Sequence, residues 1–210
     1  MRFVILFILI SLFLVFPARS ETIQFTVDLD NTNPFTSQTM VGSFLTQCIK
    51  ELSGAEIAIL CSSGIKGSIY KGTTDSSVLP NLFYFPEDKV VLIELTGRQI
   101  KEIMERSIAD YPDESVNFLQ VSGLIGTFDT SLPAGQRIID IYIGGNIIDL
   151  KRNYRVAVDD KLASGFSGYI IFTQGRILNS SSLTLRETVK QYIQSHPVIG
   201  RPERAGLKSR

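Results

Sequence analysis

Hydrophobic positions recur at helical spacing in three parts of the chain. The pattern predicts helices over 37–52, from Thr96 to Ile108, and from Thr184 to Ile193, each with one apolar face. Thr96 and Thr184 are each followed three residues later by a glutamine or a glutamate. This is capping-box spacing, so both threonines are predicted to start their helices.

Short apolar runs between these segments have the length and composition of strands. The runs 56–61 and 90–95 are predicted to be buried strands, and 23–27 alternates as a further strand does. After Phe118 the chain is mostly strand, and 144–146 (Gly-Gly-Asn) between two apolar runs is typical of a β-hairpin. The order of elements agrees with an α/β (or α+β) fold, in which about three helices pack on a mixed sheet.

The N-terminus has a different pattern. Arg2 precedes an apolar run over 3–16, and Ala-Arg-Ser follows at 18–20. This arrangement is typical of a secretory signal peptide, with cleavage after Ser20. The run is shorter than the about 20 residues that a membrane-spanning helix needs, so an uncleaved anchor is the less favoured alternative. We expect a secreted or periplasmic protein without a stable membrane anchor.

Composition limits the domain organisation and the partners. The 210 residues, 44% of them hydrophobic, are enough for one domain with a proper core. With 21 basic and 21 acidic residues, nothing suggests a nucleic-acid surface. After the signal peptide, 1–20, we expect an N-terminal extension or linker over 21–36, the folded domain over 37–201, and a basic flexible tail over 202–210.

The two cysteines, Cys48 and Cys61, are not predicted to form a disulfide. Cys48 lies in the predicted helix before the turn at Gly54, and Cys61 ends the predicted strand after it. Cys48 is thus about 9 Å along the helix from Gly54, and Cys61 is about 23 Å along the strand from it. A disulfide needs Cα atoms within about 7 Å of each other. Buried free thiols are therefore expected.

The sequence lacks the side chains of the familiar hydrolytic centres. His196 is the single histidine, which excludes a histidine-rich dimetal centre, and its position near the C-terminus does not favour a Ser–His–Asp triad. Walker and G-x-S-x-G motifs are absent. Asp159 and Asp160 could form an acidic pair, but adjacent strand residues point to opposite faces. No catalytic residue, metal or cofactor is predicted.

Three motifs together resemble the C-terminal domain of the 5′-nucleotidase family. They are E-L-T-G at 94–97, F-L-Q-V-S-G at 118–123 and Y-R-V-A at 154–157, within a resemblance that spans about 37–201. Members of that family are exported enzymes that dephosphorylate nucleotides, and a separate N-terminal domain holds their two metal ions. The resemblance implies a stand-alone C-terminal domain, linked to nucleotide breakdown and not catalytic alone.

The resemblance also implies a ligand site in the first half of the chain. The family's N-S-G-G-I-R segment matches 61–66, so that Lys66 stands where an arginine reaches the nucleotide. Lysine keeps the charge but loses the bidentate fork. Phe85 best matches a phenylalanine that stacks on the base. The alternative is that Phe83 and Phe85 are both core aromatics.

Further candidate residues lie between Asp160 and Tyr169. Lys161 and Ser167 stand at the family positions of a second stacking phenylalanine and of a ribose-binding aspartate, and Phe166 replaces a glycine. Lys66 and Lys161 could attract an anion, and Phe166 and Tyr169 could form a substitute aromatic wall.

Two classes of function follow from these matches. One is a nucleotide- or nucleoside-binding module, or an accessory to a separately encoded metallophosphatase domain. The alternative is a ligand-free scaffold or protein-interaction domain, which the lost family residues favour. A third possibility is a truncated gene product with no independent role.

Overall fold

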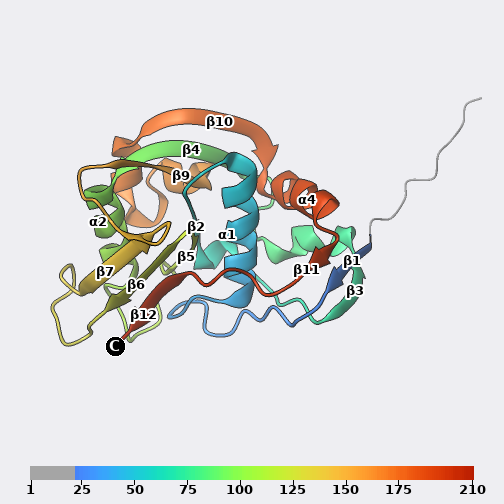
Figure 1. Cartoon of the computed structure of the whole chain (residues 1–210), viewed down its shortest axis with the longest axis horizontal. Coiled ribbons are helices and arrows are strands. Elements are labelled where there is room, and N and C mark those ends of the chain that lie inside the picture. Colours follow the sequence, from blue (N-terminus) through green and yellow to red (C-terminus); the bar gives the residue numbers. More distant parts are fainter. Residues whose placement is uncertain (1–21) are drawn as a thin grey trace, which may run out of the picture.

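The computed structural model describes residues 22–210, so the predicted signal peptide lies outside the described residues. A five-stranded mixed sheet forms the centre of this region (Figure 1). It contains β2 (Ile57–Cys61), β4 (Lys89–Thr96), β5 (Leu119–Ser122), β9 (Asn153–Asp159) and β10 (Arg176–Thr184), in the order β10-β4-β9-β2-β5. Strands β2 and β9 are parallel, and the other neighbours are antiparallel. The predicted mixed sheet is confirmed.

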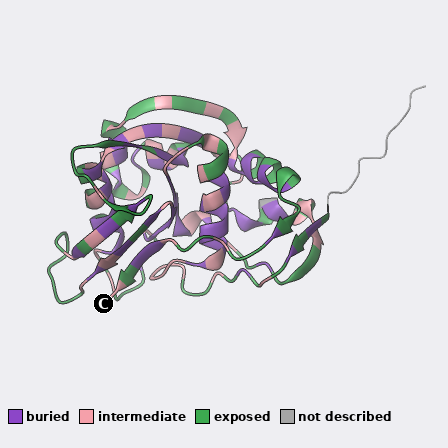
Figure 2. Cartoon of the chain, viewed as in Figure 1, coloured by how far each residue is buried: buried purple, intermediate pink, exposed green. Residues whose placement is uncertain are grey.

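Both faces of the central sheet are covered. Helices α1 (Met40–Ser53) and α4 (Leu185–Ser195) lie on one face, while α2 (Gly97–Ser107), the short α3 (Asp160–Ala163) and a second sheet lie on the other. Strand side chains alternate between faces, so Ile59 of β2 joins one core cluster and its neighbour Leu60 joins the other. Figure 2 shows the buried positions along the central strands and the inner side of α1.

The three predicted helices are present, and their capping residues explain where they start. Thr96 and Thr184 form complete capping boxes with Gln99 and Glu187 at the starts of α2 and α4. Helix α1 begins later than predicted because Thr39 is its N-cap, with Oγ1 accepting a hydrogen bond from the Gly42 amide at 2.9 Å. None of the helices in residues 22–210 combines the length and the apolar character needed to cross a membrane.

The second sheet has four strands and covers α2. It contains β6 (Leu124–Phe128), β7 (Ile138–Ile143), β8 (Asn146–Ile147) and β12 (Gly206–Ser209), in the order β12-β6-β7-β8. Strands β7 and β8 form the predicted hairpin, and Gly144 and Gly145 at its turn both have positive φ.

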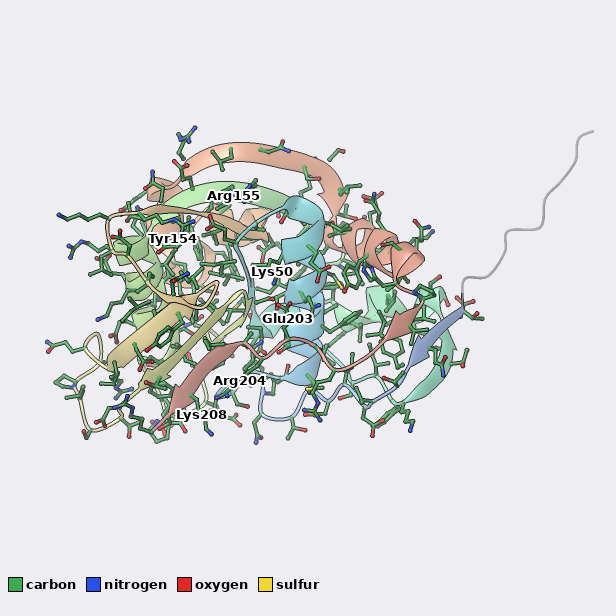
Figure 3. All side chains as sticks on the ribbon, in the orientation of Figure 1. Lys50, Tyr154, Arg155, Glu203, Arg204 and Lys208 are labelled. Carbon is green, nitrogen blue, oxygen red and sulfur yellow. The ribbon has the colours of Figure 1, made fainter. Side chains whose placement is uncertain are left out.

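The prediction of a flexible tail over 202–210 is wrong, because the second half of this segment forms strand β12. This strand runs parallel to β6, and Leu207 is only 9% exposed. The partner position is Gly126, where an added Cβ would clash with the Asp140 carbonyl and would lie 2.9 Å from the Leu207 side chain, so the glycine makes room for both. On the way to β12, the segment that contains Glu203 crosses α1 (Figure 3).

The prediction of a linker over 21–36 is also wrong in part, because strand β1 near the start of this segment belongs to the folded core. Strand β1 (Thr22–Phe25) lies between β3 (Gly72–Asp75) and β11 (Val198–Ile199) in a small sheet. Ile23, Phe25 and Leu29 are buried in the same cluster as α1. Residues 72–82 hold β3 and a 3-10 helix, Ser76–Leu82. Three further 3-10 helices are Ser62–Gly64, Phe166–Gly168 and Ile170–Gln174.

Candidate functional site

A pocket opens at the carboxyl ends of the parallel strands β2 and β9. Cys61 ends β2 and Asp159 ends β9, and both line the pocket. Ligand sites of α/β proteins commonly lie at the carboxyl ends of parallel strands. The pocket is an open hollow, and the about 410 Å³ between its walls includes open solvent. The other lining residues are Leu60, Ser63, Gly64, Ile65, Phe83, Phe85, Asp88, Lys161, Leu162, Phe166 and Leu185.

A buried hydrogen-bond network fixes the turn after β2. The Ser62 hydroxyl donates to the Pro34 carbonyl at 2.6 Å, and the Gln120 amide donates to the Ser62 hydroxyl at 3.0 Å. Gln120 is fully buried on β5, and its Oε1 accepts from the Thr39 amide at 2.8 Å. Gln120 is not among the residues predicted from the sequence, although a glutamine inside an apolar strand is a detectable signal of such a network.

Three carboxylates lie on one side of the pocket. Oxygen atoms of Asp88, Asp159 and Asp160 all lie within 4.8 Å of one another. Asp159 Oδ1 accepts from the Leu162 amide at 2.8 Å and so caps α3. Burial, with Asp88 and Asp160 adding to it, raises the pKa of the Asp159 carboxyl to about 6. The expectation that adjacent strand residues keep Asp159 and Asp160 apart is wrong, because Asp160 is already the first residue of α3.

Three of the predicted site residues come together at the pocket. Lys161 Nζ lies 3.0 Å from Asp88 Oδ2 and 3.2 Å from the centroid of the Phe85 ring. The rings of Phe85 and Phe166 are half-exposed, at 48% and 50%. Phe83 is buried, so it is a core aromatic, whereas Phe85 is not.

The other three predicted residues do not line the pocket. Tyr169 is fully buried, its hydroxyl donates to the Asn117 carbonyl at 2.6 Å, and burial raises its pKa well above the usual value. The idea that Tyr169 forms an aromatic wall is therefore wrong. Lys66 instead lies with Nζ 5.2 Å from the ring centroid of Tyr84. Ser167 has a positive φ of 57°, and its carbonyl accepts from Arg106 Nη2 at 2.6 Å.

The histidine and the cysteines have structural surroundings. His196 is exposed, and its ring stacks on Tyr192 with centroids 4.2 Å apart. Cys48 and Cys61 are free, buried and in different core clusters on the two faces of the sheet. The prediction of buried free thiols is confirmed.

This fold and pocket define the chain as an α/β domain with an open pocket at the carboxyl edge of a mixed sheet. The family model described as "5'-nucleotidase, C-terminal domain" matches residues 18–174. The chain therefore belongs to the family of 5′-nucleotidase C-terminal domains, as the sequence motifs predict.

Known relatives agree with this family and are much longer than the matched region. The chain is 31% identical over 148 residues to the trifunctional nucleotide phosphoesterase protein YfkN of Bacillus subtilis, covering 66% of this chain and 10% of that protein. It is 26% identical over 164 residues to a 5′-nucleotidase of Vibrio parahaemolyticus, covering 77% of this chain and 28% of the relative. The chain thus spans well under two thirds of either relative.

Solved structures show the same fold. A 5′-nucleotidase precursor from Thermus thermophilus superposes with a TM-score of 0.81 at 24% identity, over 91% of this chain and 39% of that one. The NAD nucleotidase of Haemophilus influenzae superposes with a TM-score of 0.77 at 16% identity, over 90% of this chain and 38% of that one. The predicted α/β fold is confirmed.

Proposed function

We propose that this chain is an exported module of nucleotide breakdown, which binds a nucleoside or nucleotide and catalyses no hydrolysis alone. The observation that carries the proposal is the pair of half-exposed rings, Phe85 and Phe166, at a pocket on the carboxyl edge of the sheet. Stacking of a base on an aromatic side chain contributes about 1–3 kcal/mol in single-strand-binding proteins.

The chemistry around the pocket supports binding rather than catalysis. The single histidine of the sequence, His196, stacks on Tyr192 and is not among the pocket residues. Of the two lining carboxylates, Asp88 is paired with Lys161 and Asp159 caps a helix. A separately encoded metallophosphatase domain would supply the hydrolytic step in this proposal. The apolar run after Arg2 supports export.

Isothermal titration calorimetry of the purified protein with adenosine, AMP, UMP and phosphate tests the proposal. We expect saturable binding of at least one nucleoside or nucleotide, and loss of that binding in Phe85→Ala and Phe166→Ala. Tyr70→Ala is the matched control, because Tyr70 is an exposed aromatic residue that does not line the pocket. Absence of saturable heat with every ligand at up to about 1 mM would overturn the proposal and favour a scaffold or protein-interaction domain.

A further inference from the structure

The ammonium group of Lys161 covers the face of the Phe85 ring on which a base would stack. Its ammonium lies between the Phe85 ring, 3.2 Å from the centroid, and the Asp88 carboxylate at 3.0 Å. An aromatic face and a carboxylate together satisfy a cation. The ammonium group is thus already paired inside the site, and it covers one face of a ring that is otherwise half-exposed. A ligand that stacks on this face has to displace it.

The pocket has more negative than positive charge. Among the residues that line it, Lys161 is the one cation, and Asp88 and Asp159 are the two anions. The Asp160 carboxylate lies within 4.8 Å of both aspartates and adds a third negative charge. Lys66, the other cation predicted for this site, lies over Tyr84 and outside the lining. The raised pKa of Asp159, to which its two acidic neighbours contribute, agrees with this excess of negative charge.

This charge distribution discriminates between ligands that share a base. A phosphate group would bring about two negative charges toward three carboxylates, and its one cationic partner is already paired with Asp88. The hydroxyl and amino groups of a nucleoside carry no charge, and carboxylates accept hydrogen bonds from such donors. The repulsion therefore acts on the nucleotide and not on the nucleoside.

We infer that the ligand of this pocket is an uncharged nucleoside rather than a nucleotide, and that Lys161 is a built-in competitor for the Phe85 ring. The inference rests on the proposed function, because it assumes that the base stacks in this pocket. It assigns Lys161 two opposite effects. The ammonium hinders stacking of any base, and it also offsets part of the negative charge that repels a phosphate.

Calorimetric titration of adenosine and AMP into the wild type and Lys161→Met tests the inference. The wild type should bind adenosine about tenfold more tightly than AMP. In Lys161→Met, which keeps the chain length and removes the charge, adenosine should bind more tightly and AMP more weakly. Lys190→Met is the matched control, because Lys190 is exposed on α4 and does not line the pocket, so both affinities should stay unchanged.

A second variant separates charge from stacking. Asp159→Asn keeps a helix-capping oxygen and removes one negative charge, so it should raise the affinity for AMP relative to the affinity for adenosine. AMP binding at least as tight as adenosine in the wild type would overturn the inference but leave the proposed function intact. Weakening of both ligands by Lys161→Met would do the same, since Lys161 would then be a ligand contact. Binding of neither compound would overturn the proposed function and this inference together.

Discussion

Lys50 Nζ and Glu203 Oε2 lie 2.7 Å apart, although 153 positions separate these residues in the sequence (Figure 3). The Glu203 amide also donates to the Gln47 side chain at 3.1 Å, so two residues of α1 hold the C-terminal segment. Beyond this crossing the chain forms β12 on the edge of β6. The last residues therefore connect α1 on one face of the central sheet with the second sheet on the other.

Removal of residues 202–210 should lower the free energy of unfolding by about 2–4 kcal/mol, because the Leu207 side chain leaves the core and β6 loses a ladder partner. Urea unfolding measures this change. The matched control is Lys50→Met, which removes only the partly exposed ion pair and should cost at most about 1 kcal/mol. Equal effects of the truncation and of Lys50→Met would mean that β12 does not stabilise the fold.

Gln120→Ala should destabilise the domain by about 3 kcal/mol, because it removes the hydrogen bonds of a fully buried side chain. These bonds reach the Thr39 amide at 2.8 Å, the Ser62 hydroxyl at 3.0 Å, and two carbonyl groups in 34–37. The Ser62 hydroxyl keeps its second hydrogen bond, so the cost comes mainly from the Thr39 amide. Hydrogen exchange should also become faster around Thr39. Gln136→Ala, at an exposed turn, is the control and should change stability by less than about 0.5 kcal/mol. A similar cost at both positions would contradict a special role for Gln120.

Local features of the fold could be predicted because neighbouring residues determine them. Thr96 and Thr184 start their helices through contacts three residues away, and the two glycines of the β7–β8 turn allow a tight hairpin. The sequence does not predict strand β10, because it lies at the sheet edge with every residue at least partly exposed and so lacks a period-two pattern. Strand β12 was missed because its partner, β6, is about 80 positions away and the basic composition of the tail is typical of disorder.

Part of the candidate site could be predicted from the family motifs. Phe85, Lys161 and Phe166 were found through family motifs, and the structure brings them to one pocket. Asp88 was missed, since a charged residue in a turn has no periodic signal, and its pairing with Lys161 depends on the packing of two distant segments. The motif gives the position of Tyr169 in the chain but not the direction of its side chain, which is fully buried.

Asp159→Asn should stabilise the protein at neutral pH and have little effect in acid. The Asp159 carboxyl has a pKa of about 6 in the folded state, against an ordinary value of 3.8. Between these two values the folded state holds more protons than the unfolded state, so stability falls as the pH rises through this window. The substitution should therefore raise the free energy of unfolding by roughly 2 kcal/mol at about pH 7 and hardly change it below about pH 4.

Urea unfolding of the wild type and Asp159→Asn across this pH range measures the effect. Asp113→Asn is the control, because Asp113 is exposed and its difference from the wild type should not depend on pH in this way. A gap between wild type and Asp159→Asn that stays constant from acid to neutral pH would contradict the raised pKa.

Thiol labelling should distinguish the two cysteines by their position relative to the pocket. Burial raises the pKa of both thiols, which keeps them protonated and slow to react in the folded protein. Cys61 lines the pocket, and its Sγ lies 3.1 Å from the Ser63 hydroxyl, whereas Cys48 is fully buried on the inner face of α1. Cys61 should therefore react about tenfold faster with an aromatic disulfide reagent. The variants Cys48→Ser and Cys61→Ser assign the two rates, and saturating adenosine should slow labelling of Cys61 alone.

In urea without reductant both thiols should react fully. A loss of both thiols there would indicate a disulfide and contradict the separation of the two residues across the sheet.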